Sequence, residues 1–305
     1  MTPSISVLVS TRNRPEQVVN CVRRILATAD ADFELIVIDQ SPREQREQAR
    51  QAIGIDQRMR WIETSTQGLS ASRNVGLSFV SAPIVAFTDD DCEVAPNWLP
   101  SIRGEFQADE SLDMIFGAVM LRPEDRASGY AAEFEPITRT EFIGHVPDIS
   151  EQWGIGANMA FRRKIFERVG RFDELLGAGS AFYAGEEIDL TIRAFSQGFK
   201  AVYTPEVRVL HLGIRTGAEA ARLMRGYGIG LGATLAKHRR LRTPGAADLL
   251  ALAVKHHGFR SVRNLLRGDR HPGFGLTAAI LLGAARSLRF GIDRERGVFN
   301  THGGR

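Results

Sequence analysis

The sequence predicts an α/β protein, with a Rossmann-like mixed sheet flanked by helices and a helical extension at the C-terminal end. Three observations lead to this fold class. Apolar runs alternate with amphipathic segments through the first hundred residues, 43% of the 305 residues are hydrophobic, and a basic, helix-rich segment follows residue 214. Near-continuous apolar strands separated by helices are typical of βαβ units, whose sheet is covered on both faces.

The elements of the first hundred residues follow from the period of their apolar side chains. Short apolar runs predict strands at Ser4–Val9, Phe33–Ile38, Arg60–Glu63 and Ile84–Phe87. Between these runs the apolar residues recur at helical spacing, as Val18, Val22 and Ile25 do in the first helix. The helices expected here are Pro15–Thr28, Arg43–Ile53 and Leu69–Val80.

The middle of the chain predicts a mixed region, and its end predicts helices. Strands are expected at Met114–Val119, Ala157–Phe161, Ala201–Tyr203 and Val207–Leu210. A helix is expected over Glu187–Gln197, because Ile188, Ile192 and Phe195 would lie on one face. Beyond Thr216, Pro-Gly pairs separate three predicted helices: Ala218–His238, Ala246–Leu266 and Phe274–Phe290.

Charge divides the chain into two parts. Residues 1–214 have a net charge of −9, whereas residues 215–305 carry 17 Lys and Arg against 5 Asp and Glu, or +12. We therefore expect two regions with different partners, an acidic one over 1–214 and a basic, mostly helical one over 215–305. Basic clusters at Lys237–Arg240 and Arg260–Arg270 alternate with apolar stretches, which suits an anionic membrane surface. The alternative is a helical cap on the first domain with a solvated basic face.

Several classes of protein are not favoured. The apolar, uncharged run at residues 272–285 has 14 residues, and no uncharged run exceeds 15, whereas a membrane-spanning helix needs about 20. Cys21 and Cys92 form no CxxC pair, so neither a zinc site nor a disulfide scaffold is indicated. The first residues lack the pattern of a signal peptide. No nucleic-acid-binding module is recognised, so no nucleic-acid partner is expected. We expect a cytoplasmic protein, or one peripheral on the cytoplasmic face of the membrane.

Polar side chains follow three of the predicted parallel strands. Ser10–Asn13 come after the first strand, Asp39 after the second and Asp89–Asp91 after the fourth. In sheets of this kind ligands bind beyond the carboxyl ends of the strands. The sequence therefore predicts a polar ligand site at this edge of the sheet.

The acids in "AFTDDD" (residues 86–91) indicate a cation site. Adjacent carboxylates repel each other and need compensating charge. Side chains alternate along a strand, so Asp89 and Asp91 are expected to converge while Asp90 points elsewhere. Two carboxylates with few other ligands suit Mg²⁺ or Mn²⁺ that also holds a diphosphate. The alternative is a solvated acidic turn or a helix N-cap.

At this point the chain resembles a family 2 glycosyltransferase of the GT-A fold. The matching segments occur in order over about residues 4–214: "VSTRNRP" (9–15), "IVIDQS" (36–41), "GLSASRNVGL" (68–77), "AFTDDD" (86–91), "GIGANMAFRR" (154–163), "VGRFDELLG" (169–177), "GEEIDLTIRAFSQGF" (185–199) and "VLHLG" (209–213). Each segment alone is weakly specific, and the ordered set is highly specific. The resemblance implies a GT-A fold, with residues 1–214 as the catalytic domain, and inverting, nucleotide-sugar-dependent transfer.

The resemblance also implies a role for each motif. The residues expected to contact the nucleotide sugar are Thr11, Arg12, Asn13, Asp39, Arg73, Asn74, Asp89 and Asp90. The segment near the donor sugar and the acceptor contributes Trp153, Gly156 and Asn158. The ligands implied for Mg²⁺ or Mn²⁺ are Asp91, Asp89 and His211. Other interpretations stay open. Asp39 would also serve as a helix cap, Arg73 as a surface ion pair, Trp153 as core packing and His211 as a structural side chain.

The catalytic base is expected in the glycine-acid-acid segment that starts at Gly185. In the family the second acid is the base, and here that position is Glu187. Glutamate stands where aspartate is frequent, and its extra methylene lengthens the reach by about 1.5 Å, so Glu186 remains a candidate. The helix dipole favours acids at this position for structural reasons as well. Asp189 is expected to cap or brace the turn.

The implied reaction moves a sugar from a nucleotide-diphosphate sugar to a hydroxyl of a glycan, lipid-linked or small-molecule acceptor. Such a reaction would belong to cell-surface polysaccharide or glycoconjugate synthesis. One alternative is a sugar-phosphate nucleotidyltransferase, which would need a glycine-rich phosphate loop after the first strand. The segment "STRNRPE" at that position has no glycine. The other alternative is a non-catalytic nucleotide- or nucleic-acid-binding protein.

Overall fold

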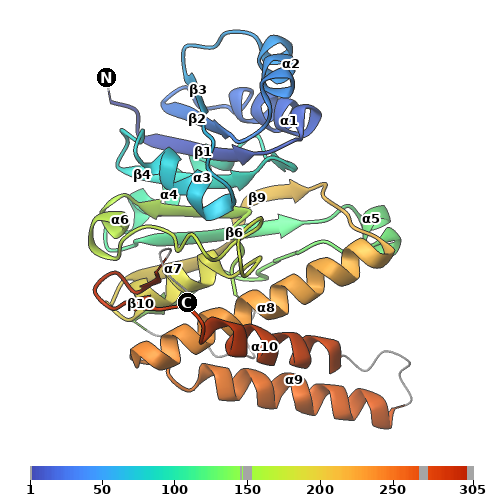
Figure 1. Cartoon of the computed structure of the whole chain (residues 1–305). Coiled ribbons are helices and arrows are strands. Elements are labelled where there is room, and N and C mark those ends of the chain that lie inside the picture. Colours follow the sequence, from blue (N-terminus) through green and yellow to red (C-terminus); the bar gives the residue numbers. More distant parts are fainter. Residues whose placement is uncertain (1, 145, 147–152, 268–273, 301–305) are drawn as a thin grey trace.

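The computed structural model describes residues 2–144, 146, 153–267 and 274–300, with a mixed sheet flanked by helices (Figure 1). The strands are β1 (Ile5–Thr11), β2 (Phe33–Asp39), β3 (Met59–Glu63), β4 (Ile84–Asp89), β5 (Cys92–Val94), β6 (Met114–Met120), β7 (Thr140–Ile143), β8 (Asn158–Arg162), β9 (Lys200–His211), β10 (Ile292–Asp293) and β11 (Val298–Phe299). The helices are α1 (Pro15–Leu26), α2 (Arg43–Ile53), α3 (Leu69–Leu77), α4 (Trp98–Ala108), α5 (Pro123–Ser128), α6 (Lys164–Arg168), α7 (Glu186–Phe195), α8 (Gly217–Leu241), α9 (Leu249–Leu266) and α10 (Phe274–Ser287).

The order of strands in the sheet is β3-β2-β1-β4-β8-β6-β9-β5, and β7 pairs with β9. The first four strands are parallel, and β8 runs antiparallel to β4. In this register Thr11 of β1 pairs with Asp39 of β2, and Ser10 pairs with Asp89 of β4. The polar strand ends therefore meet at one edge of the sheet, as the sequence predicts.

The core lies between the sheet and its helices. Strands β1, β2 and β4 are buried along nearly their whole length, which explains their uninterrupted apolar sequences. Phe87 of β4 packs edge-to-face against Phe161 and Phe172, with ring centroids 5.9 and 5.6 Å apart. This packing fixes the end of β4, and with it the start of the acid-rich turn.

The strand and helix predictions are largely confirmed, with differences that matter for the site. The runs expected as two strands, Ala201–Tyr203 and Val207–Leu210, form one strand, β9, which ends at His211. Strand β5 was not predicted, because three residues containing a glutamate give no strand signal. It pairs Cys92 with His211. That pairing brings the imidazole, distant in sequence, next to the aspartates.

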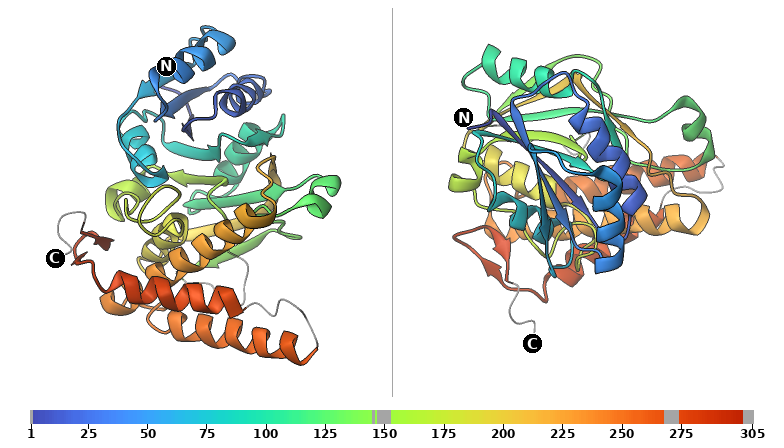
Figure 2. Two further views of the ribbon diagram at one scale, coloured as in Figure 1. Left: turned by 45° about the vertical axis from the view of Figure 1, so that its right-hand side comes forward. Right: turned by 90° about the horizontal axis from the view of Figure 1, so that it is seen from above.

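The three long C-terminal helices lie together beyond the sheet layer (Figure 2), and α8 contacts α7 through Lys237 and Asp189. Helices α8 and α10 approach closely through glycines: a Cβ on Gly232 would lie 1.9 Å from the carbonyl oxygen of Ile280, and one on Gly283 would lie 2.0 Å from that of Ile229. Helix α9 lies on the far side of α8 and α10 from the sheet (Figure 1). None of the helices in the described ranges has the length and apolar content required to span a membrane.

One expectation about the basic region is corrected. The cluster Lys237–Arg240 was expected to form a basic surface, but Lys237 and His238 are fully buried. They face α7 instead of solvent, because both side chains contact the Asp189 carboxylate of α7. The domain boundary at 214/215 remains a prediction.

Candidate active site

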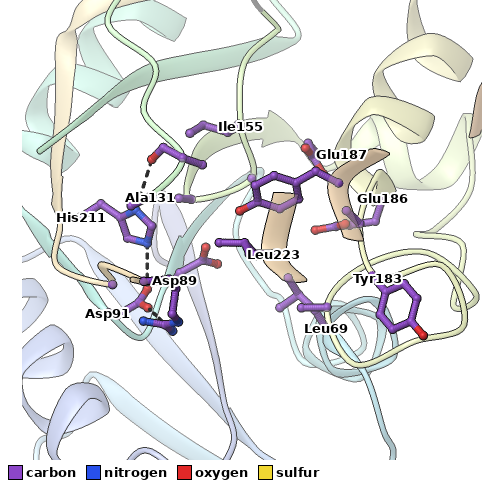
Figure 3. A pocket seen from close by; sticks show the side chains of 18 of the residues that line it. Leu69, Asp89, Asp91, Ala131, Ile155, Tyr183, Glu186, Glu187, His211 and Leu223 are labelled. Carbon is purple, nitrogen blue, oxygen red and sulfur yellow. Dashed lines mark hydrogen bonds and ion pairs between the residues drawn. The ribbon is translucent and has the colours of Figure 1, made fainter. Parts of the chain in front are cut away.

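A cavity of about 830 Å³ lies beyond the carboxyl ends of β1 and β4. Its lining includes the three aspartates, the start of α7 and residues of α8, α9 and α10. Figure 3 shows Asp89, Asp91 and His211 on one side of this space and Glu186 and Glu187 on the other. The cavity therefore separates an acid-histidine cluster from a pair of glutamates.

Asp90 binds Thr11, the last residue of β1, and Arg14 in the loop that follows. Its carboxylate accepts a hydrogen bond of 2.7 Å from the Thr11 hydroxyl and one of 2.9 Å from the Arg14 guanidinium. The same guanidinium nitrogen donates to Asp91 at 3.0 Å. The expectation that Asp90 points away from Asp91 is thus wrong, because β4 ends at Asp89 and strand alternation stops there. Burial raises the pKa of Asp90 to about 6, although the charge of Arg14 opposes this effect.

Asp91 and His211 form the part of the cluster best suited to a metal ion. Nε2 of His211 lies 3.3 Å from Oδ1 of Asp91, and Nδ1 lies 3.2 Å from the carbonyl oxygen of Ala132. If Nδ1 donates to this carbonyl, Nε2 presents a lone pair to a carboxylate, and a cation or a proton is needed between them. Burial of Asp91 acts to raise its pKa, but His211 and Arg14 outweigh burial and lower the pKa to about 2.

Cys92 lies beside these ligands. A ligand atom from each of Asp91, Cys92 and His211 lies within 4.8 Å of the other two. Burial raises the pKa of the Cys92 thiol well above its usual value, and the nearby aspartates add to the effect. A protonated thiol is a poor ligand for Mg²⁺ or Mn²⁺. The donor set therefore fits a hard cation held by Asp91 and His211, with Asp89 facing the same cavity.

Arg73 links the two sides of the cavity floor. Its guanidinium donates to Asp89 at 3.1 Å, to Glu186 at 3.0 Å and to the carbonyl oxygen of Gly156 at 3.0 Å. The side chain is only 3% exposed and lies over the rings of Phe87 and Phe172. These contacts favour an ion-pair role over a direct phosphate contact, but the ion pair is buried rather than on the surface.

The two glutamates stand at the start of α7. Gly185 precedes them with φ of 95°, in the left-handed region that glycine tolerates. Glu186 is buried and paired with Arg73, whereas Glu187 is partly exposed to the cavity. Burial raises the pKa of Glu187 well above its usual value, and the adjacent charge of Glu186 adds to this shift. Glu187 therefore holds a proton more readily than an ordinary glutamate.

Asp189, one turn further along α7, belongs to a buried ionic network. Its carboxylate lies 2.6 Å from Lys237, 2.9 Å from His238 and 2.9 Å from Arg193, and Lys237 also contacts Asp173 at 2.6 Å. Burial alone would raise the Asp189 pKa, but the charges of Lys237 and Arg193 lower it. Asp189 thus braces α7 against α8, in line with the bracing role expected from the sequence.

The loop after β1 adjoins a second, smaller cavity of about 480 Å³. Arg12 borders both cavities, and Asn13 borders the smaller one. Asn13 has φ of 59°, and its backbone N–H donates to the Ser41 hydroxyl. Asp39 is buried, and its carboxylate accepts from the N–H of Ser41 at 2.7 Å. This bond closes a turn after β2 and is not a helix cap, because α2 has Pro42 at its N-cap position and no side-chain capping bond.

The remaining predicted residues divide into two groups. Trp153 and Gly156 line the large cavity. Asn158 does not: its amide accepts from the indole of Trp98 and donates to two backbone carbonyls, at 2.9 Å in each case. Asn74 likewise binds Phe172 and Glu174, away from the cavity. The observed contacts of both asparagines are structural, and their predicted ligand roles stay predictions.

Sequence reasoning missed several residues of the cavity. Arg14 lies within the motif "VSTRNRP", shortly after the first strand. A basic residue at this strand end is a signal that could have paired it with the aspartates, which it contacts in the structure. Tyr130 lies in a segment without a recognisable motif, and Tyr227 comes from α8. Both line the cavity, and their ring centroids are 6.4 Å apart. Only the packing of α8 over the sheet edge makes this pair, so no local pattern predicts it.

A mixed sheet with acid-bearing strand ends, facing a helix that starts with two acids, defines an enzyme of the GT-A class. The sequence profile described as "Glycosyl transferase family 2" matches residues 6–170, and the chain belongs to this family. Family and fold together make it a glycosyltransferase that uses a nucleotide sugar. The GT-A fold and the family membership expected from the sequence are thereby confirmed.

Relatives and solved structures agree with this assignment. The chain is 24% identical over 222 residues to a glucosyl-dolichyl phosphate glucuronosyltransferase of Haloferax volcanii, covering 69% of each chain. It is 26% identical over 215 residues to glycosyltransferase AglE of the same organism, covering 68% of this chain and 67% of that one.

The fold is similar to that of a Pyrobaculum calidifontis mannosyltransferase solved with GDP-Man and Mn²⁺, with a TM-score of 0.62, 17% identity and coverage of 94% and 88% of the two chains. The S. aureus TarS structure with UDP-GlcNAc gives a TM-score of 0.57, 14% identity and coverage of 95% and 94%.

Proposed function

We propose that this protein is a divalent-metal-dependent, inverting glycosyltransferase with Glu187 as its catalytic base. The observation that carries the proposal is the placement of Asp91 and His211 across one cavity from Glu187 (Figure 3). The nucleoside diphosphate would lie at the ends of β1, β2 and β4, near Thr11, Arg12 and Asp90. The sugar would then lie between the diphosphate and Glu187.

The proposed cation is Mg²⁺ or Mn²⁺, held by Asp91 and His211 with Asp89 nearby. A bound divalent ion neutralises charge on a diphosphate leaving group. The Pyrobaculum calidifontis structure, solved with Mn²⁺, supports a metal of this kind. Arg14 and Arg215, with nitrogens 3.0 and 3.9 Å from Asp91, add positive charge beside the same position.

In the proposed reaction, the acceptor hydroxyl attacks the anomeric carbon of the donor from the side opposite the diphosphate. The new C–O bond forms as the bond to the diphosphate breaks, and the nucleoside diphosphate leaves with the bonding electron pair. The Glu187 carboxylate accepts the hydroxyl proton. One displacement inverts the configuration at the anomeric carbon, through an oxocarbenium-like transition state.

Glu187 is the better base of the two glutamates. Glu186 is buried and already engaged in an ion pair with Arg73 at 3.0 Å. The surroundings of Glu187 raise its pKa, so its carboxylate binds the transferred proton more strongly. A base with a pKa nearer to the working pH is the more effective catalyst.

Substitution of each glutamate tests this assignment. We expect Glu187→Gln to lower the turnover number by about 100- to 10,000-fold, the usual contribution of a general base, while a nucleoside diphosphate still binds in calorimetry. Glu186→Gln is the matched control. It breaks the Arg73 ion pair and should affect stability as well as turnover. Normal turnover by Glu187→Gln, measured as nucleoside diphosphate release across a panel of nucleotide sugars, would move the base elsewhere.

The nucleotidyltransferase alternative is not favoured. The loop between β1 and α1 lacks glycine, and the family match and the structural similarities are to glycosyltransferases. The structurally similar proteins bind GDP-Man in one case and UDP-GlcNAc in the other, so the donor sugar and nucleobase stay open. We place the activity in polysaccharide or glycoconjugate synthesis, as the names of the relatives suggest.

We further propose that the C-terminal helices contact an anionic membrane surface. On α9, Phe259, Val262 and Leu266 recur at helical spacing and are 70%, 47% and 83% exposed. Exposed basic side chains, including Arg260 and Arg263, flank this stripe. An exposed apolar stripe with basic flanks fits the interface of a bilayer with anionic lipids. Haloferax volcanii relatives include an enzyme named for a lipid-linked substrate.

Vesicle co-sedimentation tests the membrane proposal. The protein should sediment with vesicles of phosphatidylglycerol and phosphatidylcholine, less so with phosphatidylcholine alone, and less at high salt. Phe259→Asp should weaken the association. Ile55→Asp should not, because Ile55 is also exposed but lies between α2 and β3, outside the C-terminal helices. Equal sedimentation of Phe259→Asp and the wild type would refute the role of this stripe.

A further inference from the structure

The large cavity is chemically divided. Toward the sheet it is polar and charged, lined by the aspartates, Arg12, Arg14 and His211. Toward the C-terminal helices its lining is mainly apolar, with Leu223, Met224, Tyr227 and Leu231 from α8 and Leu276 from α10. The start of α7, with Glu187, lies between these halves.

The apolar half is held open by the fold. The glycine contacts between α8 and α10 fix the two helices against each other. The Asp189–Lys237 ion pair fixes α8 to α7. Leu223 projects toward the space between the acid-histidine cluster and the glutamates (Figure 3). The wall of α8 is therefore set in a defined position relative to the catalytic base.

Tyr227 lies where the two halves meet. Burial raises the pKa of the Tyr227 phenol, and the negative charges of Tyr130 and Glu187 add to this effect. The phenol therefore stays protonated and can donate a hydrogen bond near the base. The aromatic faces of Tyr227 and Tyr130 offer a surface for the apolar side of a ligand.

The cavity opens at an apolar rim. Met224 on α8 is 43% exposed, and Tyr183, which also lines the cavity, is 47% exposed. On α10, Phe274 lies two residues before the lining residue Leu276 and is 44% exposed. An apolar group bound inside can thus continue outward past Met224 and Tyr183, whose ring also lies under the Arg286 guanidinium.

We infer that the apolar half is an acceptor subsite for a hydrocarbon chain. The acceptor would be amphiphilic, with its reactive hydroxyl at Glu187 and its chain along α8 and α10. This inference rests on the proposed function, which places the nucleoside diphosphate at the sheet edge. A nucleobase is not the expected occupant, because the smaller cavity beside Arg12 and Ser41 adjoins that edge and gives the base a site of its own.

Binding of alkyl glucosides tests the subsite without knowledge of the natural acceptor. Methyl and octyl β-glucoside, the latter below its micelle-forming concentration, are titrated into the protein with Mn²⁺ and a nucleoside diphosphate present. Octyl glucoside should bind about tenfold or more tightly than methyl glucoside, since each methylene in an apolar pocket contributes to affinity. Equal affinity for both compounds would overturn the inference.

Three variants locate the binding. Leu223→Asn, and Met224→Asn at the exposed rim where misfolding is not a concern, should weaken octyl glucoside binding and leave methyl glucoside binding unaltered. Phe259→Asn, on the outer stripe of α9, should leave both unaltered. If only Phe259→Asn weakened binding, the chain would bind the outer surface and the inference would fail. Metal-dependent binding of the nucleoside diphosphate is measured in the same titrations. Its absence would contradict the proposed function, separately from the result with alkyl chains.

Discussion

Replacing Lys237 by methionine should destabilise the protein strongly, although the residue lies in a segment rich in surface-type basic residues. Its ammonium group is fully buried, 2.6 Å from both Asp173 and Asp189. Methionine has a similar volume, so the main effect of Lys237→Met is to leave two buried carboxylates without this cation. Asp189 keeps Arg193 and His238, and Asp173 keeps the backbone N–H of Phe299 at 2.7 Å.

The expected magnitude follows from this arrangement. Removing one partner of a buried ion pair typically costs about 3–5 kcal/mol. The entropy of unfolding is about 2.1 cal/mol/K per residue, hence about 0.6 kcal/mol/K for a chain of this size. Lys237→Met should therefore lower the Tm by about 5–8 °C. Adding Asp173→Asn removes one orphaned charge and should recover part of the loss.

Thermal unfolding followed by circular dichroism, at neutral pH, measures this effect. The matched control is Lys255→Met, which makes the same change at an exposed position of α9 and should change stability by no more than about 0.5 kcal/mol. If both variants unfolded within about 1 °C of the wild type, the buried network would contribute no net stability, and the tie between α7 and α8 would be refuted.

Three further predictions concern other parts of the structure. Burial lowers the pKa of His238, so the unfolded chain takes up a proton below about pH 6.5 more readily than the folded one, and the wild type loses stability there. The Tm gap between wild type and His238→Gln should thus shrink from about pH 7.5 to about pH 5.5, and a constant gap would contradict this. Gly232→Ala should destabilise by about 1–3 kcal/mol because its Cβ would meet Ile280, whereas Gly258→Ala on α9, with open space around it, should stabilise slightly. Equal effects of the two in thermal unfolding would argue against the close packing of α8 and α10. The transfer rate at saturating donor should fall on the acid side as Glu187 becomes protonated, at a pH above the usual glutamate pKa of about 4.3, and a flat acid limb would exclude Glu187 as base.

The part of the site that follows from sequence is the part fixed by strand topology. Parallel strands place their carboxyl ends at one edge, so Thr11, Asp39 and Asp89 were expected together, and they lie together. The family motifs added His211 and Glu187, which local chemistry alone did not single out. The three-residue strand β5 gave no periodic signal, yet it determines where His211 lies.

The apolar wall and the ionic network could not be predicted, because both depend on how α8 docks. The helical period of α8 shows that it has an apolar face, but not which element that face contacts. Lys237 and His238 lie in a run of basic residues that is typical of a surface, and only their tertiary partners explain their burial. Asn158 is the opposite case. A family motif indicated that it contacts a ligand, but its amide binds Trp98 and the backbone carbonyl of Ala118.

Calorimetric titration of UDP, GDP and dTDP, with and without Mn²⁺, tests the proposed site most directly. At least one of them should bind the wild type only when Mn²⁺ is present, lose that binding in Asp91→Asn and keep it in Glu187→Gln. Tight binding that ignores Mn²⁺, or that survives in Asp91→Asn, would show that the aspartate–histidine cluster does not hold the diphosphate.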